Sequence, residues 1–159
     1  MLDYIANNES RVKIISTGRQ WGKTTLALSE AHKSGNALYV APSYMMLKKV
    51  EKRSNITFMY PKQFTGFEFD PLWKLVVIDE AAFVREDVIA KLDADTRKHN
   101  CKFLVLSTPN GKTGQFARLY AKYINREDAL TLTLPSNADL HPDVYSEKAY
   151  LQEILGQFV

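Results

Sequence analysis

The stretch RVKIISTGRQWGKTTLALSEAHKS, residues 11–34, decides the fold of this chain. Its first part, RVKIIST, is rich in β-branched residues and predicts a strand, and GKTTLALSEAHKS (22–34) predicts a helix closed by Gly35. Between them, STGRQWGKTT (16–25) nearly matches the phosphate-binding pattern G-x-x-x-x-G-K-[ST], with Thr17 in place of the first glycine. In such a turn, backbone N–H groups converge on an anion at the start of a helix. An ordinary strand-to-helix turn has no need of Arg, Trp, Gly and Lys together, so we favour a phosphate-binding loop.

Apolar runs and amphipathic stretches keep alternating along the rest of the chain, and 61–73 is the least regular segment. Further strands are expected at 37–42, 55–60, 74–80, 102–107 and 129–135. Further helices are expected at 43–53, 85–99, 114–124 and 146–158. This order predicts an α/β fold, a mostly parallel sheet flanked by helices on both faces. The length of 159 residues suits one domain, 1–159.

Composition narrows the class of protein. Hydrophobic residues make up 45% and charged residues 25%, as in soluble globular proteins, and no apolar run is long enough to span a membrane. The segment 1–10 lacks the apolar core of a signal peptide, so we expect a protein that is not secreted. The single cysteine, Cys101, opens an apolar run and is interpreted as a core residue rather than a reactive thiol. A net charge of +3 is compatible with a polyanionic partner, although a solvated surface is the simpler interpretation of the basic stretch 47–53.

A second pattern is KLVVIDEAA, residues 74–82. Its apolar residues predict a buried strand, after which Asp79 emerges at the carboxyl edge, where open α/β sheets bind ligands. An aspartate there can hold Mg²⁺, and Glu80 beside it can orient and deprotonate a water molecule. Alone, two acids after a strand more often cap a helix. Together with the upstream loop, they indicate a catalytic site.

A third pattern is FLVLSTPNG, residues 103–111, in which Ser107 and Thr108 follow a buried strand. These side chains either reach the same ligand-binding edge or form a plain exit through Pro109 and the Asn-Gly turn. The residues alone leave both interpretations open.

Taken together, TGRQWGKTT, VVIDEAAF and LSTPNG resemble the ATPase domain of the large terminase subunits of tailed phages and related viruses, the motors that drive DNA into capsids. In that family the loop is typically G/S-R-Q-x-G-K-[ST], so a missing first glycine is normal. The match runs from about Arg11 to the end of the chain, where YLQEILGQF resembles the family's Q-E-x-x-x-x-F ending. The resemblance implies a P-loop ATPase fold of the ASCE class, with the strand at 102–107 between the Walker A and Walker B strands.

The resemblance also implies roles for single residues. Arg19 is expected to approach the γ-phosphate, Lys23 and Thr24 form the Walker A pair, Asp79 is the Walker B acid, and Glu80 is the catalytic glutamate. Thr24 and Asp79 would hold the metal. The nucleotide-binding residues are expected to be Thr17, Gly18, Arg19, Gln20, Trp21, Gly22, Lys23, Thr24 and Thr25.

Two further roles follow from the resemblance. Ser107, Thr108 and Pro109 match the coupling motif, which relays the nucleotide state to DNA movement. A second, trans-acting arginine of the family lies between the Walker A and Walker B motifs, where this chain has only Arg53. The alternative is that Arg53 caps the carboxyl end of the predicted helix 43–53.

The function implied is Mg²⁺-dependent ATP hydrolysis that powers the translocation of double-stranded DNA into a procapsid. The expected cofactors are ATP and Mg²⁺. The expected partners are double-stranded DNA, the portal protein, the small terminase subunit and further copies of this chain in a ring. No membrane partner is expected, and the expected location is the cytoplasm of the infected host cell. Three departures from the family stand out. Residues 1–12 hold no adenine-reading glutamine, and the segment between the strands at 37–42 and 74–80 is short. The chain also stops at Val159, before the family's nuclease domain, so either it is a fragment or the nuclease is separate or absent, and we expect no nuclease activity in this chain.

Two other functions compete. DEAA and STP echo motifs of superfamily 2 helicases, but a helicase needs a second RecA-like domain that 159 residues cannot hold. A nucleotide-binding scaffold without turnover is the other, and the presence of Glu80 argues against it because a scaffold has no need of a base.

Overall fold

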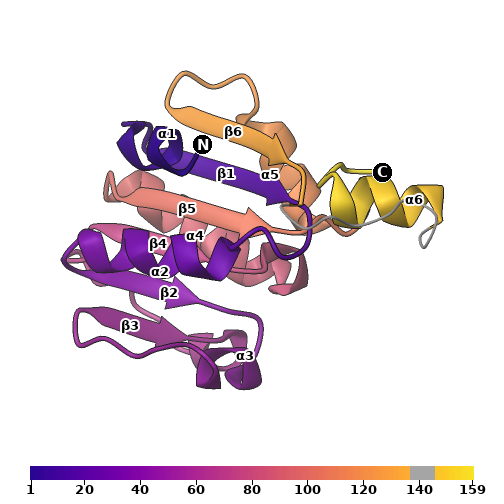
Figure 1. Cartoon of the computed structure of the whole chain (residues 1–159). Coiled ribbons are helices and arrows are strands. Elements are labelled where there is room, and N and C mark those ends of the chain that lie inside the picture. The colour runs from indigo at the N-terminus through magenta and orange to yellow at the C-terminus, as the bar shows by residue number, and fades with distance from the viewer. Residues whose placement is uncertain (137–145) are drawn as a thin grey trace.

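A six-stranded sheet forms the centre of the protein (Figure 1), whose computed structural model describes residues 1–136 and 146–159. Every pair of neighbouring strands is parallel, in the order β3-β2-β4-β5-β1-β6. The strands are β1 (Val12–Thr17), β2 (Ala37–Val40), β3 (Ile56–Met59), β4 (Leu75–Ile78), β5 (Lys102–Ser107) and β6 (Ala129–Leu134). The α/β prediction is therefore confirmed, and β5 lies between β1 and β4, as the resemblance implied.

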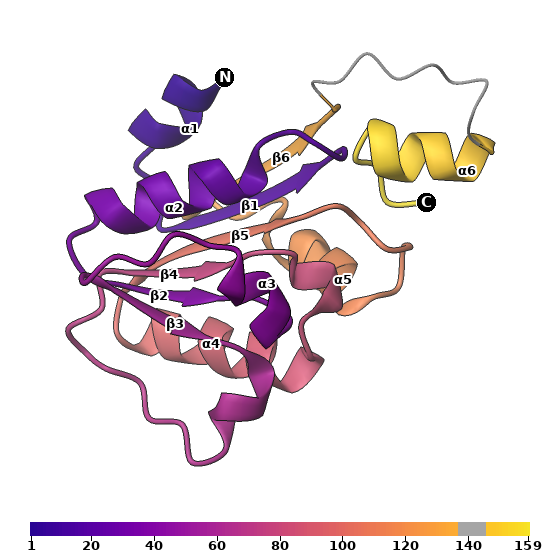
Figure 2. The ribbon, with the colours of Figure 1, turned by 60° about the horizontal axis from the view of Figure 1, so that its bottom comes forward.

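Helices cover both faces of the sheet. The α-helices of the described residues are α1 (Leu2–Asn7), α2 (Lys23–Lys33), α3 (Tyr44–Lys48), α4 (Glu86–Lys98), α5 (Gln115–Tyr123) and α6 (Glu147–Ala149). The last of them continues as a π-helical turn over Tyr150–Ile154 and lies beyond the ends of the strands (Figure 1). Figure 2 shows α1 and α2 on one face and α4 and α5 on the other. Within the described residues, no helix combines the length and apolar character needed to cross a bilayer.

The core has one layer on each side of the sheet, because successive strand residues point to opposite faces. Along β1, Ile14 joins the cluster beneath α4 and α5, whereas Ile15 joins the cluster beneath α2. Both faces are buried, which explains why the strands read as nearly continuous apolar runs. Cys101 belongs to the first cluster, and burial raises the pKa of its thiol to about 11, which agrees with the interpretation as a core residue.

The structure corrects the helix predicted at 43–53, which covers only Tyr44–Lys48 and is followed by a loop. The last turn tightens, since the Lys49 and Val50 N–H groups donate to carbonyls three residues earlier. The ammonium of Lys52 donates to the Leu47 carbonyl, one of the last carbonyls of this helix. The alternative role for Arg53, capping this helix, is therefore wrong.

The short helix α1 was not predicted, because its six residues are too few to show a helical pattern. Only Ile5 of this helix is fully buried, against α2 and its neighbours. A single buried residue gives no periodic signal in the sequence.

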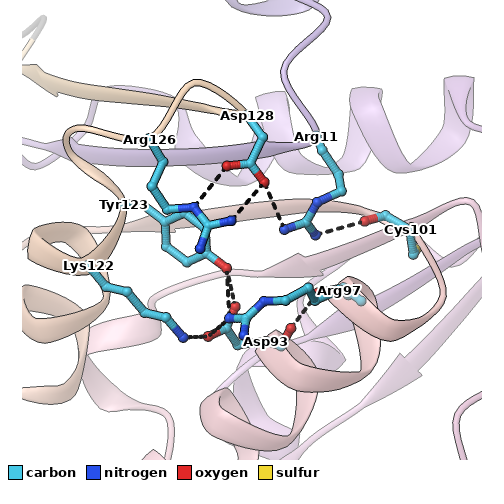
Figure 3. Close-up of polar contacts among 9 residues, drawn as sticks. Arg11, Asp93, Arg97, Cys101, Lys122, Tyr123, Arg126 and Asp128 are labelled. Atoms are coloured by element: carbon cyan, nitrogen blue, oxygen red, sulfur yellow. Dashed lines mark hydrogen bonds and ion pairs between the residues drawn. The ribbon is translucent and has the colours of Figure 1, made fainter.

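A polar network ties α4 to α5 on the far face of the sheet (Figure 3). Asp93 of α4 is buried and accepts hydrogen bonds from Lys122 and from the hydroxyl of Tyr123, both at 2.5 Å, while Arg97 lies 3.3 Å away. A buried carboxylate needs such partners, since an unpaired charge in the core is costly. The network fixes how α5 packs against α4.

Candidate functional site

The turn between β1 and α2 has the backbone of an anion-binding loop. Gln20 and Gly22 both adopt left-handed conformations, with φ of 54° and 93°, and α2 begins directly afterwards at Lys23. At Gly22 a side chain would meet open space, so the conformation rather than crowding favours glycine. The loop thus presents the amino end of an eleven-residue helix at the carboxyl edge of the sheet.

Gly18 is favoured because other backbone segments approach it too closely for a side chain. Its φ is not in the left-handed region, but a β-carbon there would lie 2.1 Å from the Ile154 carbonyl oxygen and 2.5 Å from the Ser136 nitrogen. The backbones of the carboxyl-terminal segment and of the end of β6 therefore pass directly over Gly18. Gly18 is therefore favoured by this close approach of backbones and not by an unusual backbone dihedral.

Gly18→Ala is therefore expected to destabilise the fold by overpacking. A new methyl group against backbone atoms typically costs about 1–3 kcal/mol. For a domain of this size, each kcal/mol lowers Tm by roughly 2–4 °C. Thermal unfolding followed by circular dichroism measures the change, and an unaltered Tm would show that the carboxyl-terminal segment does not rest on this residue.

Asp79 lies just beyond β4 and is almost fully buried, with 2% of its surface exposed. Its Oδ2 accepts hydrogen bonds from the Thr24 hydroxyl at 2.8 Å and from the Tyr39 hydroxyl at 2.6 Å. Its Oδ1 accepts from the N–H of Glu80 at 3.0 Å. Burial and the charge of Asp79 raise the pKa of Tyr39, so its phenol keeps the proton that it donates. Tyr39 was not predicted as a site residue, because in the sequence it looks like one more apolar residue of a buried strand.

Lys23, Glu80 and Thr108 meet beside this carboxylate. The Lys23 ammonium donates to the Thr108 hydroxyl at 3.0 Å and lies 3.5 Å from a Glu80 carboxylate oxygen. Lys23 is buried although it is a lysine, so its charge is held in place by these two partners. Three segments far apart in the sequence thus converge at one edge of the sheet.

The backbone of Glu80 is strained and its carboxyl group is perturbed. Its φ of 51° lies in the left-handed region, which costs a non-glycine residue about 1–2 kcal/mol. Burial raises the pKa of Glu80, Lys23 counters this, and the nearby Asp79 adds to the increase. Such strain and perturbation are concentrated at functional sites.

The residues that follow β5 are also at this edge. Ser107 is fully buried, accepts a hydrogen bond from the Ala82 N–H at 3.0 Å and donates to the Thr108 carbonyl at 2.8 Å. It therefore links the end of β5 to the segment that follows Asp79 and Glu80. Thr108 contacts Lys23, and Pro109 lines the adjoining hollow, so this segment is more than a plain exit from the strand.

A hollow of about 570 Å³ opens beside these groups, lined among others by Arg19, Lys23, Glu80 and Thr108. The carboxyl-terminal segment forms its far wall. The Glu153 carboxylate lies 3.1 Å from the Arg19 guanidinium, and the Glu153 carbonyl accepts a hydrogen bond from the Arg19 N–H at 2.6 Å. The contact between the Q-E pair of YLQEILGQF and the loop was not predicted from the sequence.

A smaller hollow of about 210 Å³ lies next to it and is lined by Thr24, Tyr39 and Asp79. Met46 of α3 borders both hollows. The hydroxyl of Thr24 and the carboxylate of Asp79 are hard oxygen donors, the kind that Mg²⁺ prefers.

Several of the predicted site residues lie away from both hollows. The Thr17 side chain is fully buried beneath the loop. Trp21 packs in the core cluster under α2, and Trp21 and Thr25 border a hollow between α1 and α2. Arg53 lies in the loop before β3, where it pairs with the exposed Glu51 at 3.5 Å. Of the predicted site, a single chain therefore brings together the loop, Asp79, Glu80 and Thr108.

Comparisons with known proteins place this arrangement in a known fold. No protein-family model and no curated protein matches the sequence. Among solved structures, the chain is similar to the large terminase ATPase domain of Thermus phage P74-26, with 16% identity and a TM-score of 0.76 over 99% of this chain and 92% of that chain.

Two longer proteins are also similar to it. The large terminase of a thermophilic bacteriophage, solved in complex with ADP, shows 15% identity and a TM-score of 0.70 over 99% of this chain and 53% of that chain. The large terminase of bacteriophage HK97 shows 15% identity and a TM-score of 0.62 over 99% of this chain and 48% of that chain. The chain therefore spans about half the length of these two proteins, and it has the fold of phage large-terminase ATPase domains.

Proposed function

We propose that this chain is a Mg²⁺-dependent ATPase that powers the packaging of double-stranded viral DNA, as the ATPase part of a large terminase. The observation that carries the proposal is the convergence of Lys23, Thr24, Asp79 and Glu80 at the carboxyl edge of the sheet. The similarity in fold to large terminases, one of which was solved both with ADP and with ATP-gamma-S, supports it.

Nucleotide phosphates would be held by the loop backbone and by Lys23. The ammonium of Lys23 already has anionic and hydroxyl partners in Glu80 and Thr108, and a phosphate would replace these partners. Arg19 borders the same hollow, and 61% of its side chain is exposed, so it has room to turn from Glu153 towards a γ-phosphate. The cations needed to offset the charge of a triphosphate are therefore gathered on one wall.

Thr24 and Asp79 would hold the magnesium ion, because their oxygen atoms lie 2.8 Å apart beside the smaller hollow. When bound, Mg²⁺ neutralises charge that develops on the phosphate oxygens during phosphoryl transfer. Glu80 would take a proton from the attacking water, and its raised pKa makes it a stronger base than an ordinary glutamate. The hydrogen bonds of Ser107 connect this site to β5, along which a coupling signal would run.

Phosphate release from ATP, with and without double-stranded DNA, tests the proposal. We expect Mg²⁺-dependent hydrolysis that DNA stimulates. Nucleotide binding without hydrolysis would indicate a scaffold, and hydrolysis indifferent to DNA would contradict a motor. The portal protein, the small terminase subunit and a ring of identical subunits are the partners proposed on the same basis, and stimulation by the portal would identify one of them.

Arg53 is proposed as the arginine that acts in trans on a neighbouring subunit. Its side chain is 41% exposed and pairs at 3.5 Å with Glu51, which is 72% exposed. An ion pair between such exposed groups is weak, so a site on a neighbouring subunit can attract the guanidinium away from it. Arg53 does not border the hollow of its own chain, which a residue acting in trans does not need to do.

Complementation tests this role of Arg53. Mixing equal amounts of Arg53→Ala and Glu80→Gln proteins should restore part of the ATPase activity, because about one interface in four then has an intact glutamate and an intact arginine. Specific activity of the unaltered protein should also rise with its concentration. The absence of both effects would restrict Arg53 to its local ion pair with Glu51.

A further inference from the structure

Tyr39 is a buried tyrosine of β2 whose hydroxyl reaches the edge of the sheet. In the pairing of β2 with β4 it stands opposite Val77, two residues before Asp79, so its side chain and that of Asp79 lie on the same face. A long aromatic side chain spans such a diagonal between strands. The hydroxyl donates to Asp79 Oδ2 at 2.6 Å, and the ring packs against Phe58 at 5.4 Å between centroids.

The hydroxyl needs an explanation, since phenylalanine would fill the same space. Tyr39 is fully buried, and a polar atom in the core is costly unless it is hydrogen-bonded. Here its partner is the one carboxylate that our proposal places against the metal. Packing alone does not account for a tyrosine at this position.

The groups that donate to Asp79 come from different kinds of structure. Thr24 belongs to the loop that would hold the phosphates, and the N–H of Glu80 belongs to the segment that would act on the attacking water. Tyr39, in contrast, lies within a strand, under the helical layer of α2. It therefore holds Asp79 from the core of the sheet, on the side opposite to solvent.

We propose that Tyr39 is a positioning residue that orients the Asp79 carboxylate for Mg²⁺. This inference rests on the proposed Mg²⁺-ATP function of the site. Partners of this kind, behind a metal-holding group, typically change metal affinity 10–100-fold when they are removed.

Tyr39→Phe tests the role because it removes only the hydroxyl. The affinity for ADP is measured in EDTA and across a Mg²⁺ titration, using a fluorescent ADP analogue. We expect the affinity in EDTA to stay unchanged, while the Mg²⁺ concentration for half-maximal effect on binding rises about 10–100-fold. Tyr39→Met, a second variant without the hydroxyl, should likewise keep its affinity for ADP in EDTA and need more Mg²⁺ for the half-maximal effect.

Tyr123→Phe is the matched control. Tyr123 is also fully buried and its hydroxyl also donates to a buried aspartate, Asp93, on the α4–α5 side of the sheet (Figure 3). The loss of the Tyr123 hydroxyl should lower Tm and leave the Mg²⁺ concentration for half-maximal effect on ADP binding unchanged. An equal shift in both variants would show a general loss of stability and overturn the positioning role.

The outcomes for Tyr39 and for the site separate clearly. If the unaltered protein binds ADP more tightly with Mg²⁺ and Tyr39→Phe behaves in the same way, the role of Tyr39 is refuted and the proposed function stands. If the unaltered protein binds no nucleotide in either condition, the proposed function fails, and the role of Tyr39 fails with it.

Discussion

Lys23→Ala is expected to abolish ATP hydrolysis and to weaken nucleotide binding. The ammonium is buried, and its partners Thr108 and Glu80 lie within 3.0 and 3.5 Å, at the place where phosphates would bind. A unit charge about 4 Å from a phosphate is worth about 4 kcal/mol at an effective dielectric constant of ~20. Its loss corresponds to a fall of roughly 10³-fold in rate. The substitution would also remove the cation that counters the raised pKa of Glu80.

Phosphate release and the dissociation constant of ATP measure the effect of Lys23→Ala. Lys33→Ala is the matched control, because Lys33 lies at the other end of α2, is 64% exposed and pairs only loosely with Glu30 at 3.7 Å. The control should keep full activity. Undiminished hydrolysis by Lys23→Ala would refute the assignment of the loop as a phosphate-binding site.

Glu80→Gln is expected to keep nucleotide binding and lose hydrolysis. Glutamine has nearly the same shape, but its amide cannot accept a proton from water. A general base contributes typically ~10²–10⁴-fold to a rate, and we expect a loss in that range. The ion pair with Lys23 is lost as well, which frees the ammonium for phosphate and leaves binding intact or tighter.

Single-turnover hydrolysis and ATP binding, measured on the same preparation, separate the two effects of Glu80→Gln. The control is Glu86→Gln, which removes a carboxylate of α4 that is 65% exposed and pairs with Arg118. It should leave hydrolysis unaltered. A loss of only a few-fold in Glu80→Gln would show that another group activates the water.

Much of the fold and the centre of the site were predictable from local sequence. The strand, loop and helix of 11–34, the acids after KLVVI and the polar residues after FLVL each carry their signal within a few neighbouring residues. Parallel strands place their carboxyl ends at one edge, so the meeting of Lys23, Asp79 and Thr108 follows from the fold class. The carboxyl end of α3 was predicted wrongly, because the helix ends at Lys48 although the residues that follow it favour a longer helix.

Other features depend on the order of strands in the sheet, which pairs residues with no local relation. Tyr39 reads as a core residue until β2 is placed beside β4 and its hydroxyl meets Asp79. Gly18 reads as a loop glycine until Ile154, 136 positions further along, passes over it. Periodicity and turn chemistry act between near neighbours and therefore leave a trace in the sequence, whereas these contacts arise from crossovers and packing between distant segments, which only the folded chain brings together.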